Sequence, residues 1–137
     1  NIFFEIKYTE NGFGKAVNDE DHIKKFNKTY EPAMKECDVI NDEYKTMDQF
    51  LAHYQIMRNL VNINDKNYVV FIYPEENVNI KKDAEDANAN IISNNWHKHF
   101  IPITWETLVA DPNSYLSSVQ LKQYYQDKFS EKYLGYK

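Results

Sequence analysis

The sequence predicts an α/β domain in which helices pack on a mixed or parallel central sheet. Apolar segments of strand length alternate with segments of helical periodicity, in the order strand, helix, strand, helix, strand, helix. Such alternation is typical of helices layered on a sheet. The chain has 137 residues, which is long enough for one domain with a buried core, and eleven Tyr and eight Phe supply packing material.

The first predicted strand spans residues 2–8 and carries two charged side chains, Glu5 and Lys7. Because strand side chains alternate between faces, this pair projects from one side. The other side consists of Ile2, Phe4, Ile6 and Tyr8. Such apolar flanks favour an interior strand over an edge strand. A glycine-containing turn is expected over residues 9–14.

Two helical regions should follow this turn. Acidic and Asn residues at 18–21 are N-cap and first-turn candidates for a helix that runs to Thr29. Pro32 then interrupts or restarts it, and residues 31–37 form a short second piece. A stronger helix is predicted over residues 47–63, capped by Thr46 or Asp48. Its buried stripe would contain Phe50, Tyr54, Met57 and Val61.

The second strand is predicted over residues 68–73, where β-branched and aromatic residues run without a break up to Pro74. Near-continuous apolarity of this kind suits a sheet covered on both faces. A helix over residues 80–94 and a third strand over residues 101–108 follow. Asp111–Asn113 reads as a turn, and Ser114 is the expected cap of a last helix that runs to Tyr133.

Composition excludes several classes of function. The net charge is −5, so any nucleic-acid contact must come from a local patch. Cys37 is the single cysteine, which excludes an internal disulfide and favours a reducing, cytoplasmic location. The longest apolar stretch is residues 68–73, far short of the roughly 20 residues of a membrane span, so no membrane partner is expected.

The pair Glu5 and Lys7 matches the needs of phosphodiester hydrolysis. A carboxylate binds Mg²⁺ or Mn²⁺ through oxygen, and the backbone carbonyl of Ile6 is a further candidate ligand. An amine two residues along the same strand face can orient the attacking water or stabilise the charge that builds on the phosphoryl oxygens. The alternative is that these charges simply discourage aggregation at an exposed edge strand or form a weak surface ion pair.

The segment from Phe3 to Tyr8 resembles the (D/E)xK strand of the PD-(D/E)xK nuclease superfamily. Residues 5–10, followed by the Gly12-Phe13-Gly14 turn, are also similar to a bacterial subgroup of uncharacterised or restriction-associated members. In that superfamily a metal-binding Asp precedes the motif strand, and a helix and a further strand follow it. Residues 47–63 and 68–73 occur in that order. The resemblance implies a restriction-endonuclease-like fold, a mixed central sheet flanked by helices, in an Mg²⁺-dependent endonuclease that acts on DNA.

The same resemblance implies that Glu5 is the metal ligand and Lys7 the catalytic lysine. The superfamily's Asp has no counterpart here, because the chain begins at Asn1 inside the predicted strand. We therefore expect residues 1–137 to be a single nuclease-like domain that lacks an N-terminal portion.

Several subfamilies also carry a Gln near the active site on the helix that follows the motif. Gln49 and Gln55 are candidates, and Gln55 is favoured because it shares one helix face with Arg58 and Asn59. Arg58 is the only arginine in the chain, and beside two amides it suits phosphate contact. Lys15 is a further candidate for nucleic-acid binding. The alternative is an ordinary solvated helix face.

Other constellations are discounted. His97 and His99 flank Lys98, but no carboxylate or Cys spacing supports a metal pair, so a loop is favoured. Glu10 could be a second acid, although a turn carboxylate is the favoured interpretation. Two functions thus compete, a DNA nuclease and a non-catalytic module that binds nucleic acid or protein on the same fold. A homodimer is an option for either.

Overall fold

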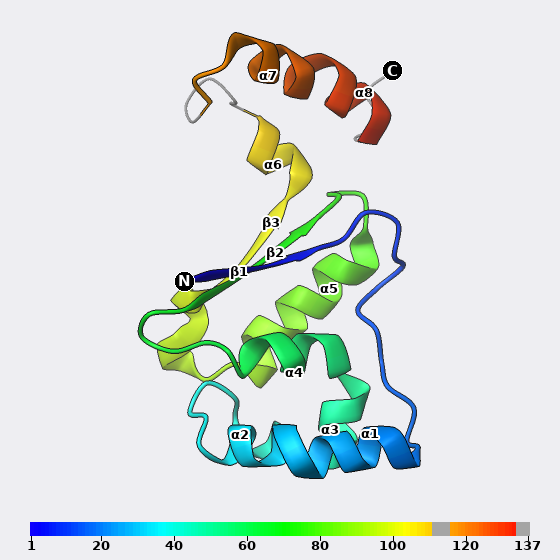
Figure 1. Ribbon diagram of the computed structural model, residues 1–137, viewed down its shortest axis with the longest axis vertical. Coiled ribbons are helices and arrows are strands. Elements are labelled where there is room, and N and C mark those ends of the chain that lie inside the picture. The colour runs from blue at the N-terminus through cyan, green and yellow to red at the C-terminus, as the bar shows by residue number, and fades with distance from the viewer. Residues whose placement is uncertain (111–115, 134–137) are drawn as a thin grey trace.

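Three parallel strands form one sheet in the order β1-β2-β3 in the computed structural model, which describes residues 1–110 and 116–133 (Figure 1). The strands are β1 (Ile2–Ile6), β2 (Tyr68–Tyr73) and β3 (Phe100–Thr104). Helical segments make the crossovers that parallel neighbours require. The α/β class is confirmed, and the arrangement is consistent with the restriction-endonuclease-like fold. Of the two sheet types that the sequence allowed, the parallel one is found in the described residues.

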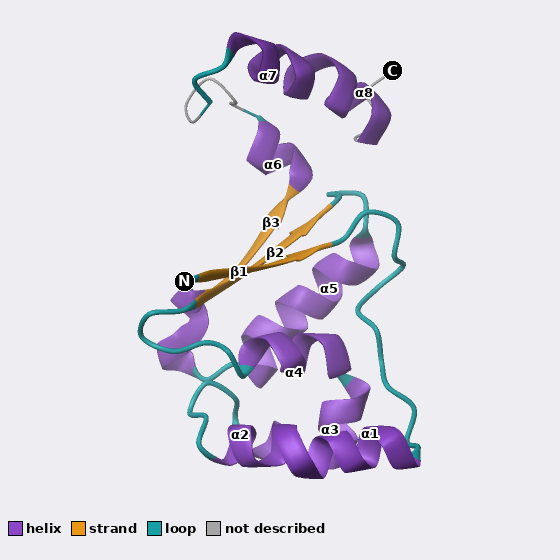
Figure 2. Ribbon diagram, viewed as in Figure 1, coloured by secondary structure: helices purple, strands orange, loops and turns teal. Residues whose placement is uncertain are grey.

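Helical segments gather in two groups around this sheet (Figure 2). The first crossover contains α1 (Glu20–Lys25), η1 (Phe26–Tyr30), α2 (Glu31–Lys35), η2 (Asp42–Tyr44), α3 (Met47–Ala52) and α4 (Tyr54–Leu60). The second contains α5 (Val78–Asp86), η3 (Ala87–Ile91) and η4 (Asn94–His99). After β3 come α6 (Trp105–Val109), α7 (Val119–Tyr124), η5 (Tyr125–Phe129) and α8 (Ser130–Tyr133). Helices α1–α5 lie on one side of the sheet, and α6–α8 lie beyond the carboxyl end of β3.

The main core lies between the sheet and helices α1–α5. Val69 and Phe71 of β2 and Phe100 of β3 pack there against buried side chains such as Phe50 and Met57 of α3 and α4. A smaller cluster forms on the opposite face, at the carboxyl end of the sheet, where Ile72 meets Trp105, Val109 and Phe129. Apolar burial on one face is therefore extensive, and on the other it is local.

Among the described residues β1 lies at the edge of the sheet, whereas the sequence favoured an interior strand. It pairs only with β2 among the described residues. Its even-numbered side chains face away from the helices and remain exposed, with Ile2 57% and Phe4 58% accessible. The same open face leaves Tyr68 exposed and Val70 half-buried at the start of β2. In the part of the chain that the structure describes, β2 is therefore covered on both faces toward its carboxyl end and not at its start.

The helix predicted over residues 47–63 is two helices, broken at His53. Thr46 caps the first one, as predicted, by accepting a hydrogen bond from the Gln49 N–H. The cause of the break lies outside the helix. The Leu51 carbonyl accepts from the Ala16 N–H at 2.9 Å, and the Gln55 N–H donates to the Gly14 carbonyl at 3.2 Å. Backbone from the loop after β1 thus replaces the helical bond that would join residues 51 and 55.

Two further boundaries differ from the prediction. Strand β3 ends at Thr104, and Trp105–Val109 is helical because the Thr104 side chain accepts from the Thr107 N–H and caps α6. The last helix starts after Ser118, which caps it. The predicted turn at Asp111–Asn113 and the predicted cap Ser114 lie outside the described residues. In the part of the chain that the structure describes, no helix is both long and apolar enough to cross a membrane.

Candidate functional site

Lys7 is the one charged side chain that is buried among the described residues. Its side chain is only 3% exposed. Its Nζ donates a hydrogen bond to Gln55 Oε1 at 2.6 Å, lies 3.5 Å from Glu5 Oε1, and stands 5.7 Å from the centre of the Phe13 ring. Because a buried ammonium is costly unless it is paired, these contacts compensate its desolvation.

Glu5 faces a polar pocket beside this amine. Its side chain is 29% exposed, and its Oε2 accepts a hydrogen bond from Asn59 Nδ2 at 3.3 Å. The pocket has a volume of about 170 Å³ and is lined by Glu5, Gln55, Arg58, Asn59 and Asn62. The single-face prediction for Glu5 and Lys7 is confirmed, because both side chains contact helix α4.

One face of α4 lines this pocket, as the helical spacing of Gln55, Arg58 and Asn59 predicted. Gln55, Arg58 and Asn59 all line the pocket, and the Arg58 guanidinium also lies 5.2 Å from the centre of the Tyr54 ring. The structure therefore brings the three predicted side chains of α4 together with Glu5 at this pocket, and Lys7 contacts Gln55 and Glu5. Neither the exposed Lys15 nor Gln49 lines the pocket.

Gln55 is held by two donors at once. Its Oε1 accepts from Lys7 Nζ and, at 2.8 Å, from the Gly14 N–H. The helix break at His53 puts Gln55 in the first turn of α4. A Cβ at Gly14 would come within 3.0 Å of the Gln55 side chain, so glycine is what allows this approach. The loop after β1 and the start of α4 thus orient the Lys7 amine together.

The backbone carbonyl of Ile6 points to the open edge of β1. The Lys7 N–H donates to the Ile72 carbonyl of β2 at 2.8 Å. Backbone groups of neighbouring strand residues point to opposite sides, so those of Ile6 point away from β2. The Ile6 carbonyl therefore points away from β2 and has no strand partner among the described residues.

Glu10 is a site residue that the sequence analysis discounted. Its Oε1 lies 3.8 Å from Lys7 Nζ, and its Oε2 accepts from the N–H groups of Tyr8 and Thr9. Hydrogen bonds from backbone N–H groups, first its own and then that of Tyr8, hold the pKa of the Glu10 carboxyl below its ordinary value. The only sequence signal was its place in the turn directly after the motif strand.

The donor set suits a hard cation with few protein ligands. Magnesium is commonly bound through one or two carboxylates and completes its shell with water and substrate phosphate oxygens. Glu5 and the Ile6 carbonyl supply oxygen donors of this kind, with Glu10 nearby. No group of three or more His, Cys, Asp or Glu residues that could enclose a metal occurs in residues 1–110 and 116–133. The site therefore fits an ion shared with substrate and does not fit a fully protein-bound one.

The discounted histidines have structural contacts. His97 Nε2 lies 3.1 Å from the Ile92 carbonyl oxygen, and His99 Nδ1 lies 3.0 Å from that of Asn67. The His99 ring also stacks on Tyr68. They occupy the short helix η4 in place of the expected loop.

Comparison with known proteins gives one match. The model of a family described as Restriction Endonuclease associating with ARP matches residues 1–134. No curated protein and no solved structure matches the sequence significantly.

Proposed function

This chain belongs to the family Restriction Endonuclease associating with ARP, and from this premise we propose an endonuclease of the PD-(D/E)xK type that hydrolyses DNA phosphodiester bonds with Mg²⁺ or Mn²⁺. One observation carries the proposal. A buried lysine amine contacts a glutamine and a glutamate at the wall of a polar pocket that also contains Arg58. A buried charge stabilises a fold less than a buried apolar group would, so a catalytic role explains the burial of Lys7 better than stability does.

Each residue has a role that follows from its position. Glu5 and the Ile6 carbonyl would hold the metal ion at the open edge of β1. The ion supplies Lewis-acid polarisation of the phosphate and a lowered pKa for bound water. Lys7, fixed by Gln55, would keep its ammonium beside the attacking water and the phosphoryl oxygens, where negative charge develops.

Arg58 and Asn59 would orient the substrate. The Arg58 guanidinium can contact phosphate oxygens through two parallel N–H groups, and the Asn59 amide keeps the Glu5 carboxylate in place. Because the net charge is −5, DNA affinity must come from this local contact. Lys15 and a homodimeric state stay predictions from the sequence.

Mutation of the motif tests the proposal. We expect Glu5→Ala and Lys7→Ala each to reduce Mg²⁺-dependent cleavage of plasmid DNA by about 100-fold or more, the loss typical of one charge-stabilising group. Glu31→Ala and Lys35→Ala are matched controls, because these residues form an exposed ion pair at 2.8 Å in α2, away from the pocket. Undiminished cleavage in both motif variants would reject the assignment.

Metal uptake separates the enzyme from a binding module. Calorimetry with Mn²⁺ should detect binding that Glu5→Ala removes and Glu31→Ala retains. If the wild-type protein binds DNA and takes up no Mg²⁺ or Mn²⁺, a non-catalytic module on the same fold is the correct function.

A further inference from the structure

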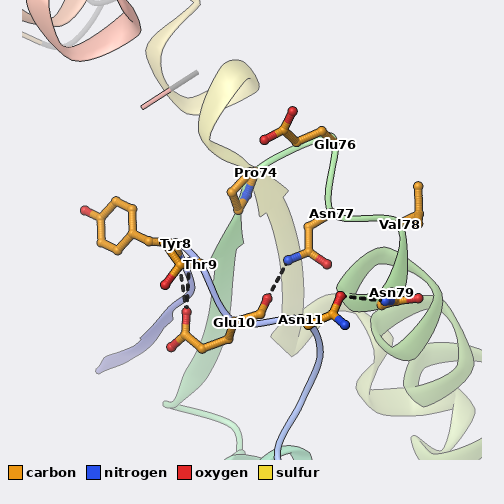
Figure 3. Close-up of a pocket in the computed structure, with 9 residues that line it drawn as sticks. All are labelled: Tyr8, Thr9, Glu10, Asn11, Pro74, Glu76, Asn77, Val78 and Asn79. Atoms are coloured by element: carbon orange, nitrogen blue, oxygen red, sulfur yellow. Dashed lines mark hydrogen bonds between the residues drawn. The ribbon is translucent and has the colours of Figure 1, made fainter. Parts of the chain in front are cut away.

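A second pocket lies at the carboxyl ends of β1 and β2, close to the candidate site (Figure 3). Its volume is about 510 Å³. Ligand sites of parallel α/β sheets lie at this end of the strands. The residues that form its rim come from the segment after β1, the connection between β2 and α5, and the start of α5. They include Glu10, Asn11, Pro74, Asn77, Val78 and Asn79.

The charge of this pocket disfavours phosphate. None of the nine residues that line it is Lys, Arg or His, and two of them, Glu10 and Glu76, are carboxylates. The Asn77 Oδ1 accepts from the Ile80 N–H at 3.1 Å, so it already caps the start of α5. An uncharged ligand that forms hydrogen bonds suits this lining better than an anion does.

Two amides offer such a ligand a donor and an acceptor together. In Figure 3 the side chains of Asn11 and Asn79 point toward one another, and Asn79 Nδ2 donates to Asn11 Oδ1 at 2.9 Å. Whichever way the two amides are oriented, one NH₂ group and one C=O group remain without a bond to any described residue. Every nucleobase presents a donor and an acceptor side by side on its Watson–Crick edge.

The rim of this pocket contacts residues of the first candidate site. Asn77 Nδ2 donates to the Glu10 carbonyl at 2.7 Å, which joins the two connections that form the pocket. Glu10 lines the pocket and also lies 3.8 Å from Lys7 Nζ. Because Glu10 borders both sites, the pocket adjoins the place of a phosphate held at Lys7, and Pro74 and Val78 form its apolar wall.

We propose that this pocket receives an unpaired nucleobase of the nucleotide next to the scissile phosphate, through hydrogen bonds to Asn11 and Asn79. The proposal rests on the proposed nuclease function for the place of the phosphate. The pocket itself would then distinguish substrates by their bases and not by their backbone.

Side-chain amide signals in ¹⁵N-labelled protein test it without any cleavage. The protein is titrated separately with the four deoxynucleosides, with 2-deoxyribose and with inorganic phosphate plus Mg²⁺. At least one deoxynucleoside should shift the NH₂ signals of Asn11 and Asn79 in a saturable way, while deoxyribose and phosphate leave them in place. Asn11→Ala and Asn79→Ala should weaken that binding about tenfold. Asn95→Ala, which removes an exposed amide outside the pocket, should not change it.

The inference is overturned if no deoxynucleoside shifts these signals, or if deoxyribose shifts them equally. The Gln55 and Asn59 amide signals report separately on the first site, where phosphate with Mg²⁺ should act. If a deoxynucleoside shifts the Asn11 and Asn79 signals but phosphate with Mg²⁺ does not shift those of Gln55 and Asn59, the nuclease function is rejected and the base pocket is kept. If only the Gln55 and Asn59 signals respond, the base pocket alone is rejected.

Discussion

The two faces of the sheet differ in what they bury. The face toward α4 and α5 covers Phe71 completely, and it also encloses the charged side chain of Lys7. The opposite face leaves Phe4 and Ile101 exposed, although both are apolar. Among the described residues, Trp105 and its neighbours cover the carboxyl end of this face.

Two residues of the first strand region, Phe4 and Lys7, depart from the distribution that stability alone would produce. Apolar groups gain most from burial, and a buried charge loses solvation. The enclosed face therefore holds a cation while a phenylalanine of β1 is exposed, which burial of apolar area alone does not explain. Exposed apolar area of this kind is typical of contact surfaces, although nothing in the described residues identifies its occupant.

The largest expected effect compares one phenylalanine from each face. Phe71→Ala should lower the free energy of unfolding by about 3–5 kcal/mol, because it empties a site packed against the rings of Phe13 and Phe100. Phe4→Ala should cost less than about 1 kcal/mol, since its side chain is largely in solvent. Urea denaturation measures both. Equal losses would mean that the two faces are buried alike in solution.

A glycine replacement tests how the enclosed face holds its lysine. Gly14→Ala would push a methyl group against the Gln55 side chain, at a cost of about 1–3 kcal/mol, and cleavage should fall with it. Val17→Ala, at an exposed position of the same loop, is the control. If Gly14→Ala retains full stability and activity, neither of them depends on the position of the Gln55 amide against Gly14.

The packing of α6 over the carboxyl end of the sheet depends on a helix cap at Thr104. Thr104→Ala removes the acceptor of the Thr107 N–H, which lies 3.1 Å away, and should destabilise the protein by about 1 kcal/mol. Fluorescence of the tryptophans should report looser packing at Trp105. The exposed Thr29, inside a helical segment, provides a control in which Thr→Ala has little effect on either measurement.

The smallest effect concerns pH. Because the pKa of Glu10 is lowered from 4.5 by backbone hydrogen bonds, its stabilisation is present above that ordinary value and is lost as pH falls through the lower folded value. Glu10→Gln should therefore cost a few tenths of a kcal/mol at pH 7, a modest sum because the side chain is half exposed. In thermal melts the variant and the wild type should converge once the pH falls below the lowered folded pKa of Glu10. A gap that persists there would show that the carboxylate charge is not responsible. Glu36→Gln, at the exposed end of α2, is the control.

Features that depend on neighbouring residues were predictable from the sequence. The bounds of β2 agree with its run of β-branched and aromatic residues, and Thr46 caps α3 as expected. The period of a strand puts Glu5 and Lys7 on one face, and helical spacing puts Gln55 with Arg58. These properties follow from local backbone geometry, which the sequence by itself determines.

Features that depend on distant backbone were decided by the tertiary structure. The helix breaks at His53 because Gly14 and Ala16, some forty residues earlier, take over its hydrogen bonds. Glu10 reaches Lys7 because the turn after β1 redirects it, and β1 lies at an edge because its only described partner is β2. Such contacts join segments far apart in the chain, and no local periodicity encodes which of those segments will meet.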